Sequence, residues 1–217
     1  MQLALLSVGR EPDPAAGIPV AFSVRTAAEV DAALAGLDAS RLVIDAAELA
    51  GLNLVLARLQ RAGRLAELET AVLLGQPDPY LAGLGLPADR AGQLALARTG
   101  SARLVGVVRD DSGGVCVSAA ELTAWDPDRP WWVRAVVDDQ RLCDGEVRRL
   151  SMRRLGPAEL AAEVQLGRFR SRRRRGRALQ LACDPAQIVA DGIGRERPRS
   201  RRTFWSEPKL WRLALPG

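Results

Sequence analysis

The chain has 217 residues and a mass of 23.4 kDa, enough for one large domain or two small ones. Hydrophobic residues make up 47% of it and charged residues 26%, so we expect a folded chain with a sizeable core. No apolar run reaches the roughly 18 residues that span a bilayer, and the first ten residues lack the regions of a secretory signal. The composition therefore excludes a membrane-spanning helix.

The residue types that are missing exclude several kinds of chemistry. Histidine is absent, which removes the usual general base near neutral pH, His-containing triads and His-ligated metal sites. Cys116, Cys143 and Cys183 are far apart and form no C-x-x-C pair, so we predict neither a disulfide framework nor a metal site. We expect buried, inert thiols and a cytoplasmic protein.

The net charge of +5 is unevenly distributed along the chain. Residues 1–139 carry 12 basic and 18 acidic side chains, whereas residues 140–217 carry 19 basic and 8 acidic ones. A basic second half is attracted to phosphate, acidic lipid or nucleic acid.

The first hundred residues alternate between strand and helix patterns. Apolar runs predict strands at residues 2–7, 18–24, 41–44 and 71–74. Apolar residues at helical spacing predict helices at 26–37, 48–61, 78–84 and 88–98, the first with a capping box formed by Thr26 and Glu29. This alternation is typical of an α/β lobe with a partly parallel sheet, which we place at residues 1–100.

The rest of the chain, residues 101–217, reads as a mostly antiparallel β-sandwich lobe. Short apolar runs predict strands at 104–108, 115–117, 131–137, 147–152, 178–183 and 187–190, and an apolar segment at 203–215 closes the lobe. Residues 111–114 and Asp144-Gly145 carry turn signals. The apolar spacing after Gly156-Pro157 predicts one helix at residues 158–166.

Three passages of the sequence are similar to the diacylglycerol kinase catalytic-domain family, which is related in fold to NAD kinases. Residues 75–87, G-Q-P-D-P-Y-L-A-G-L-G-L-P, resemble the family's G-T-x-N-D-F-A-R-x-L-G-[IL]-P and likewise follow an apolar strand. Leu52-Asn53 resembles the L-N-E that follows the family's G-G-D-G-T loop. Residues 188–192, I-V-A-D-G, resemble its late D-G-E strand.

This resemblance implies a fold and an activity. The fold would be a nucleotide-binding α/β domain followed by a β-sandwich domain, with the active site in the cleft between them. The activity would be transfer of the γ-phosphoryl group of ATP, with magnesium, to a lipid hydroxyl. Gly51, Asn53, Gly75 and Asp78 would line the nucleotide site, and Asp191 would be the candidate catalytic residue.

The phosphate-binding loop of the family is altered in this chain. Residues 47–51, A-E-L-A-G, stand where the family has G-G-D-G-T. A loop that wraps phosphate needs backbone N–H groups close to the anion, and Glu48 and Leu49 obstruct this by bulk and, for Glu48, by charge. We therefore expect ATP to bind poorly at this loop.

The second and third motifs also depart from the family pattern. Gln76, Pro77 and Pro79 replace residues that would donate hydrogen bonds, and Asp78 replaces the family's Asn. Ile193 stands where the D-G-E motif has its glutamate. Losing several donors and carboxylates together impairs phosphoryl transfer.

The densest charge run lies at residues 168–177, with seven arginines that include Arg172, Arg173, Arg174 and Arg175. Residues 195–202 add five more. The first run can be a solvated loop between a helix and a strand, a contact for an acidic membrane surface, or a nucleic-acid contact, and we weigh them in that order.

Other residue groups have ordinary structural explanations. Trp131 and Trp132 are neighbours on a predicted strand and must face opposite sides, so one belongs to the core. Asp110-Asp111 and Asp138-Asp139 lie beside turns, where aspartate commonly hydrogen-bonds the backbone.

The sequence as a whole favours a cytoplasmic, diacylglycerol-kinase-like protein with an eroded ATP site and a binding or regulatory role, peripheral to the membrane if it contacts lipid. ATP and magnesium would be cofactors only if kinase activity survives. One alternative is an active lipid kinase. The other is a nucleic-acid-associated protein that uses its arginines.

Overall fold

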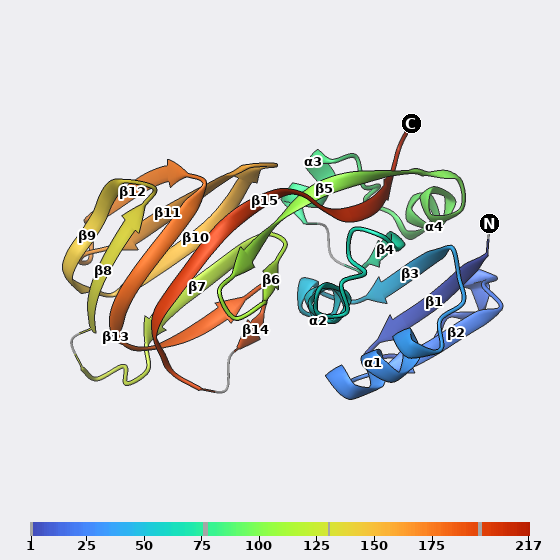
Figure 1. Ribbon diagram of the computed structural model, residues 1–217, viewed down its shortest axis with the longest axis horizontal. Helices are drawn as coiled ribbons and strands as arrows, with labels where there is room; N and C mark the ends of the chain where they lie inside the picture. The colour runs from blue at the N-terminus through green and yellow to red at the C-terminus, as the bar shows by residue number, and fades with distance from the viewer. Residues whose placement is uncertain (1, 76–77, 130, 195–196) are drawn as a thin grey trace. The chain divides into compact units, whose positions relative to one another are not determined.

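The computed structural model describes residues 2–75, 78–129, 131–194 and 197–217. The chain divides into two compact units (Figure 1). The first contains Met1–Val105 and Lys209–Gly217, and the second contains Gly106–Pro208. The chain passes from one unit to the other within two strands, β5 (Ser101–Asp110) and β15 (Arg199–Leu215). The last nine residues therefore belong with the front unit, although the sequence analysis places them in the rear lobe.

The front unit is built on a parallel sheet. Its strands are β1 (Leu3–Val8), β2 (Val20–Val24), β3 (Arg41–Ala46) and β4 (Glu69–Leu74), in the order β2-β1-β3-β4. The end of β15 adds to β4 in parallel, with Leu213 opposite Thr70. Every residue of β3 is buried, as expected for a strand covered on both faces. The predicted α/β lobe is confirmed.

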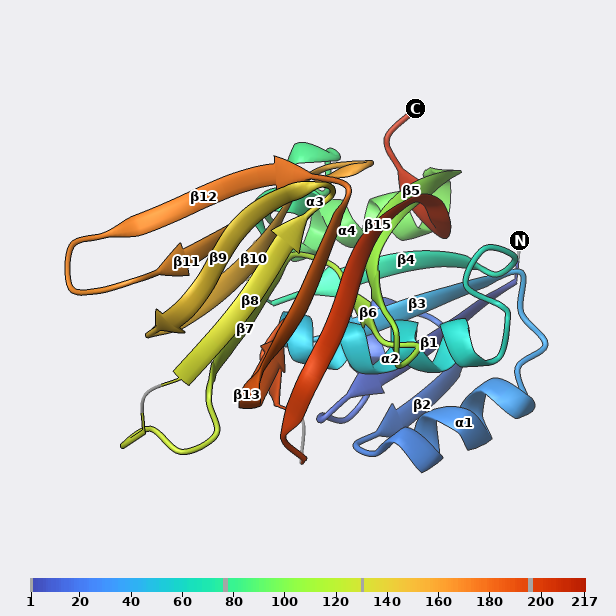
Figure 2. The ribbon, with the colours of Figure 1, turned by 60° about the vertical axis from the view of Figure 1, so that its left-hand side comes forward.

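Helices cover both faces of this sheet. They are α1 (Ala27–Ala35), α2 (Leu49–Arg61), α3 (Pro79–Gly83) and α4 (Arg90–Thr99), with a 3-10 turn at Pro14–Ala16. The predicted capping box is present at α1, where Thr26 accepts from the backbone N–H of Glu29. Helix α4 packs on the face that bears Leu5, Val43 and Ala71, while α1 and α2 contact each other on the opposite face (Figure 2).

The rear unit is almost entirely antiparallel β-structure. Its elements are the end of β5, β6 (Val115–Cys116), β7 (Ala119–Ala124), β8 (Trp131–Val137), β9 (Gln140–Val147), β10 (Arg149–Gly156), β11 (Glu159–Gln165), β12 (Ser171–Gly176), β13 (Ala178–Ala190), β14 (Ile193–Gly194) and the start of β15. Strand β13 pairs with β8 through its first half and with β7 through its second half. It thus joins two layers around a core that contains Trp131, Met152 and Phe204.

The helix predicted at residues 158–166 is wrong, because this segment forms β11. Gly156-Pro157 lies at the turn of the β10–β11 hairpin and does not begin a helix. Leu160, Ala162 and Val164 are all fully buried and Glu159 and Glu163 are exposed, as expected for a strand with a side-chain period of two, although Ala161 is buried as well. Leu160 and Val164 are four residues apart, a spacing that fits both a helix and a strand, which explains the error.

Two further expectations for the rear unit are wrong. Asp144 and Gly145 were predicted to form a turn but lie within β9. The actual turn is at Asp138, which has a positive φ of 50° and whose carboxylate accepts from the backbone N–H groups of Arg177 and Ala178. The sequence favours a solvated loop at the arginine run of residues 168–177, but residues 171–176 of this run form strand β12.

The second arginine group is partly internal. Arg202 is 5% exposed, and its Nη1 lies 2.7 Å from Asp111 Oδ1 and 3.7 Å from Asp110 Oδ1. Asp110 also accepts from the backbone N–H groups of Ser112 and Gly114, each at 2.8 Å. Burial alone would raise the pKa of Asp110, but these hydrogen bonds, that of the Ser112 hydroxyl and the Arg202 charge hold it below its usual value. Asp110 is thus the acceptor of its own turn, as expected.

Replacing Asp110 with Asn should lower the free energy of unfolding by about 2 kcal/mol at neutral pH, because a buried charge-assisted acceptor is lost. Since the folded pKa lies below the unfolded value of 3.8, this stabilisation is present above pH 3.8 and is lost as the pH falls through the folded pKa. Urea unfolding at decreasing pH measures the effect, with exposed Asp139→Asn as the control. A difference that stays constant in acid would contradict the assignment.

Candidate functional site

A cluster of ions lies where the parallel strands of the front unit end. Asp45, the penultimate residue of β3, is fully buried and pairs with Arg10, which follows β1, and with Arg90, the first residue of α4. Arg90 holds both carboxylate oxygens, with each nitrogen 3.0 Å from its oxygen. The hydrogen bond to Asp45 raises the pKa of Arg90 against the lowering effect of burial.

This cluster is nearly balanced in charge. Arg90 also lies 3.3 Å from Asp13, so two guanidinium groups face two carboxylates. Ser7 stands beside Asp45 in the strand register and is fully buried. Its hydroxyl and the Nε of Arg10 have no hydrogen-bond partner among the residues that the structure describes. In doubly wound sheets ligands bind at this carboxyl edge where the strand order reverses, which here is between β1 and β3.

The two glycines predicted to line a nucleotide site approach protein atoms closely. A Cβ on Gly51 would lie 3.1 Å from the Ala46 side chain and 3.2 Å from that of Val8. A Cβ on Gly75 would lie 2.9 Å from the carbonyl oxygen of Ala47, and the Gly75 N–H donates to Ala46. Gly51 thus lets the start of α2 approach the ends of β1 and β3, and Gly75 lets the loop after β4 approach the loop after β3.

Asn53 and Asp78 are also engaged within the fold. Asn53 is 4% exposed and lies on α2. Asp78 is the N-cap of α3, where its carboxylate accepts from the Leu81 N–H at 2.9 Å, and Pro79 occupies the first helical position. The hollow beside Asp78 measures about 20 Å³, room for about one water molecule. Gln76 and Pro77, which we expected to weaken this motif, lie outside the described residues.

Sequence reasoning missed the residues that organise this edge. Asp45 carried a signal, since an acid within the apolar run L-V-I-D-A must find a cationic partner if the strand is buried. Arg10 and Arg90 carried none, because they are distant in sequence and resemble other surface arginines. Gln93 of α4 also went unnoticed. Its side chain accepts from the Leu74 N–H at 2.8 Å and donates to the Leu74 and Pro87 carbonyls.

The candidate catalytic residue, Asp191, belongs to the rear unit and acts there as an internal acceptor. It is 7% exposed and has a positive φ of 47°. Its carboxylate accepts from the backbone N–H groups of Val117, Ser118 and Ala119, and from the Cys116 thiol at 3.4 Å. Asp191 thereby fixes the connection between β6 and β7.

The four arginines of β12 lie on an edge strand. Strand β12 is at one end of the sheet path and pairs with β11. Arg172, Arg174 and Arg175 are exposed, and Arg173 is half-buried opposite Glu163. Charged side chains on such a strand prevent its open edge from pairing with another chain. The same side chains present a dense positive surface.

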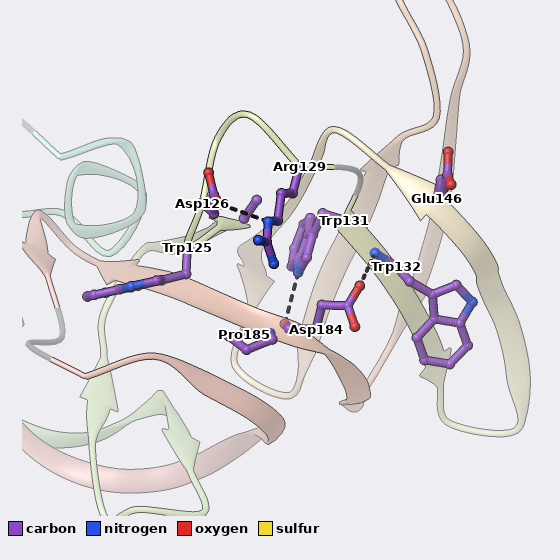
Figure 3. Close-up of a pocket in the computed structure, with 9 residues that line it drawn as sticks. Trp125, Asp126, Arg129, Trp131, Trp132, Glu146, Asp184 and Pro185 are labelled. Carbon is purple, nitrogen blue, oxygen red and sulfur yellow. Dashed lines mark hydrogen bonds and ion pairs between the residues drawn. The ribbon is translucent and has the colours of Figure 1, made fainter.

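A hollow of about 740 Å³ in the rear unit is lined by tryptophans (Figure 3). Trp131 is 2% exposed and its indole donates to the Asp184 carbonyl at 3.1 Å, whereas Trp132 is 36% exposed, so the two face opposite sides as predicted. Trp125 is 46% exposed on the other side of Trp131. Carboxylates of Asp126, Glu146 and Asp184 also line the hollow, against one cation, Arg129. Indole rings beside carboxylates suit an organic cation.

The three cysteines are buried, as expected. Burial raises the pKa of Cys143 and of Cys183 to about 11. Burial and the neighbouring Asp191 carboxylate raise the pKa of Cys116 well above its usual value. Within the described residues there is no group of three or more metal-ligating side chains, and no helix is long and apolar enough to cross a membrane.

Solved structures with the same fold span almost the whole chain. A diacylglycerol kinase from Bacillus anthracis strain Sterne aligns with 99% of this chain and 97% of its own, at 11% identity and a TM-score of 0.67. Another chain from that strain, whose assignment as a diacylglycerol kinase is provisional, aligns with the same coverage at 10% identity and a TM-score of 0.71. An NAD kinase from Archaeoglobus fulgidus, solved in complex with ATP, aligns with 98% of this chain and 93% of its own, at 9% identity and a TM-score of 0.61.

No protein-family model and no curated protein sequence matches the chain. The chain therefore has the fold of diacylglycerol kinases and NAD kinases, as the resemblance of the three motifs implied, at a sequence identity of 9–11% to these structures.

Replacing Asp191 should destabilise the protein, because three backbone N–H groups lose their acceptor. We expect Asp191→Gly, which keeps the positive φ, to lower the free energy of unfolding by about 3 kcal/mol, and Asp191→Asn to lower it less. Urea denaturation followed by tryptophan fluorescence measures both. Unchanged stability would show that the carboxylate is free for another role.

The cysteines should be unreactive in the folded protein. With Ellman's reagent at neutral pH, we expect no reaction of the native chain and reaction of all three thiols in urea, since the thiolate form is rare and covered. Rapid reaction of a native thiol would contradict the observed burial.

Proposed function

We propose that this protein is a diacylglycerol-kinase-like protein whose ATP site is impaired and which serves as a binding or regulatory protein. The observation that carries the proposal is the pairing of fully buried Asp45 with Arg10 and Arg90 at the carboxyl edge of the front sheet. The two arginines at this edge of the sheet already have anionic partners within the chain.

The cost of releasing these arginines supports weak binding of a triphosphate. A phosphate that took Arg10 and Arg90 from Asp45 would leave a buried carboxylate unpaired, at a cost of about 3–5 kcal/mol. That cost corresponds to a loss of roughly two to three and a half orders of magnitude in affinity. Asp13 beside Arg90 adds further repulsion toward an incoming anion.

The loop that would wrap the phosphates offers little to compensate. Glu48 is the N-cap of α2 but makes no side-chain capping bond, and its charge stands where the helix N-terminus would attract an anion. Gly51 and Gly75 have their open sides filled by the chain itself. These contacts do not fit a bound nucleotide, so we assign no catalytic step to ATP or magnesium.

Two alternatives predict different results. An active lipid kinase would bind ATP with magnesium and phosphorylate a lipid hydroxyl. A nucleic-acid-associated protein would bind through its arginines and ignore mononucleotides. Neither is favoured by a specific contact in the front unit. Binding of magnesium and ATP separates the lipid kinase from the proposed function, and binding of duplex DNA separates the nucleic-acid-associated protein.

Thermal unfolding with and without magnesium and ATP tests the proposal. A ligand at about 100 times its dissociation constant stabilises a protein by about 2.7 kcal/mol, which is easily seen as a shift of the midpoint. We expect no shift for the wild type and no transfer of labelled phosphate to diacylglycerol in mixed micelles. A magnesium-dependent shift that Arg90→Gln abolishes would contradict the proposal.

The variant Asp45→Asn serves as the matched control. Its neutral amide leaves two arginines opposite Asp13 alone, so it should gain weak binding of inorganic triphosphate that the wild type lacks. Circular dichroism verifies that the variant folds. Equal binding by both proteins would show that Asp45 does not occupy the arginines.

A further inference from the structure

The hairpin of β11 and β12 ends in an exposed aromatic side chain. Phe169 is 89% exposed, the most exposed of the large hydrophobic residues in the described chain. It lies between Arg168 and Arg170, and the Arg168 guanidinium lies 5.3 Å from its ring centre. The Leu166 N–H donates to the Arg170 carbonyl at 2.9 Å and closes the turn. The fold thus holds an apolar ring in solvent, flanked by two cations.

The hairpin is strongly basic. Seven arginines lie between residues 168 and 177, and no acidic residue occurs between 164 and 183. Among the described residues, none of these arginines is in an ion pair within 4.0 Å, in contrast to Arg202 and Arg90. Six of the seven are exposed, the exception being half-buried Arg173, so most of this charge faces solvent and is available to a partner.

The hairpin is also anchored firmly enough to present this tip. Val164, opposite Arg172, and Ala162, opposite Arg174, are fully buried in the rear core. Within the rear unit, Figure 2 shows the turn extending beyond the ends of the neighbouring strands. A small hollow of about 200 Å³ lies beside the tip, and its lining includes Arg149, Glu163, Arg168, Phe169 and Arg170.

We infer that the tip of the β11–β12 hairpin docks on an acidic lipid bilayer, with Phe169 at the boundary between headgroups and acyl chains and the arginines on lipid phosphates. An aromatic ring with flanking basic residues is suited to this interface, where the ring is buried and long cationic side chains remain at headgroup level. The acidic bilayer would be the partner in the proposed binding role. The inference rests on the hairpin alone and not on the state of the ATP site.

A bilayer suits the geometry better than a nucleic acid. Binding of single strands uses several aromatic platforms along a basic groove, whereas this run has a single aromatic residue, placed at its end. A duplex would be held through phosphates alone and would gain nothing from Phe169. Dependence on the ring therefore separates the two partners.

Flotation with vesicles tests the docking surface without any nucleotide. The wild type should float with mixed phosphatidylglycerol and phosphatidylcholine vesicles, not with phosphatidylcholine alone, and salt should weaken the binding. Phe169→Ala should weaken partitioning by about tenfold or more. Substituting glutamine at Arg168, Arg170, Arg172 and Arg174 should weaken it by roughly a few hundredfold.

A matched charge control separates this surface from general attraction. Glutamine at Arg25, Arg61, Arg199 and Arg201 removes the same charge from exposed positions outside the hairpin. This variant should keep most of the binding. Equal losses in both quadruple variants, or binding of duplex DNA that is as tight and unaffected by Phe169→Ala, would overturn the inference.

A probe at the tip reports insertion directly. Because the three native cysteines are buried, Phe169→Cys can be labelled selectively with a polarity-sensitive fluorophore. Its emission should shift to the blue on acidic vesicles, while the same label at Trp125→Cys should not shift. No shift at position 169 would contradict docking through the tip. If the protein binds neither lipid nor ATP, the docking inference fails and the proposal of an impaired ATP site stands. If it binds both, the proposal of an impaired ATP site fails and the docking inference stands.

Discussion

The burial of Asp45 is the constraint on which the front unit depends. A carboxylate at the end of a fully covered strand must be paired, and here its partners come from the connection after β1 and from the start of α4. One buried charge therefore fixes two distant segments against the carboxyl edge of the sheet. The edge where related folds receive a ligand is held by the chain's own ions.

The rear unit uses its acids in the same manner. Asp191 binds three backbone N–H groups, Asp138 binds those of Arg177 and Ala178, and Asp110 closes its own turn. These carboxylates stabilise loops that lack regular hydrogen bonds. With acids turned toward the backbone, the basic excess of the second half remains on the surface and is densest along β12. The uneven charge of the sequence thus corresponds to a basic surface on the rear unit, centred on β12.

Local patterns allowed much of the fold to be predicted. Thr26 and Glu29 form the expected capping box, and every strand predicted in the front lobe is present. The β11 segment was misassigned because Leu160 and Val164, four residues apart, fit a helix as well as a strand. Strands β7 and β9 were not predicted, since their small or polar residues give a weak apolar signal.

The site was harder to predict because its contacts are long-range. Motif positions drew attention to Gly51, Gly75 and Asp78 as candidate nucleotide-site residues, but they did not show which protein atoms lie against the two glycines or that Asp78 caps α3. The pairing of Asp45 with Arg10 and Arg90 joins residues 35 and 45 positions apart, and no spacing rule connects them. The exposure of Phe169 likewise required the hairpin to be seen.

A double-mutant cycle on Asp45→Asn and Arg90→Met tests the central claim most directly. Urea unfolding of the wild type, both single variants and the double variant gives the coupling free energy between the two side chains. The account predicts a coupling above about 1 kcal/mol, even though Arg90 is 35% exposed. A coupling within about 0.3 kcal/mol of zero would contradict it, because the arginine would then be free to hold a ligand.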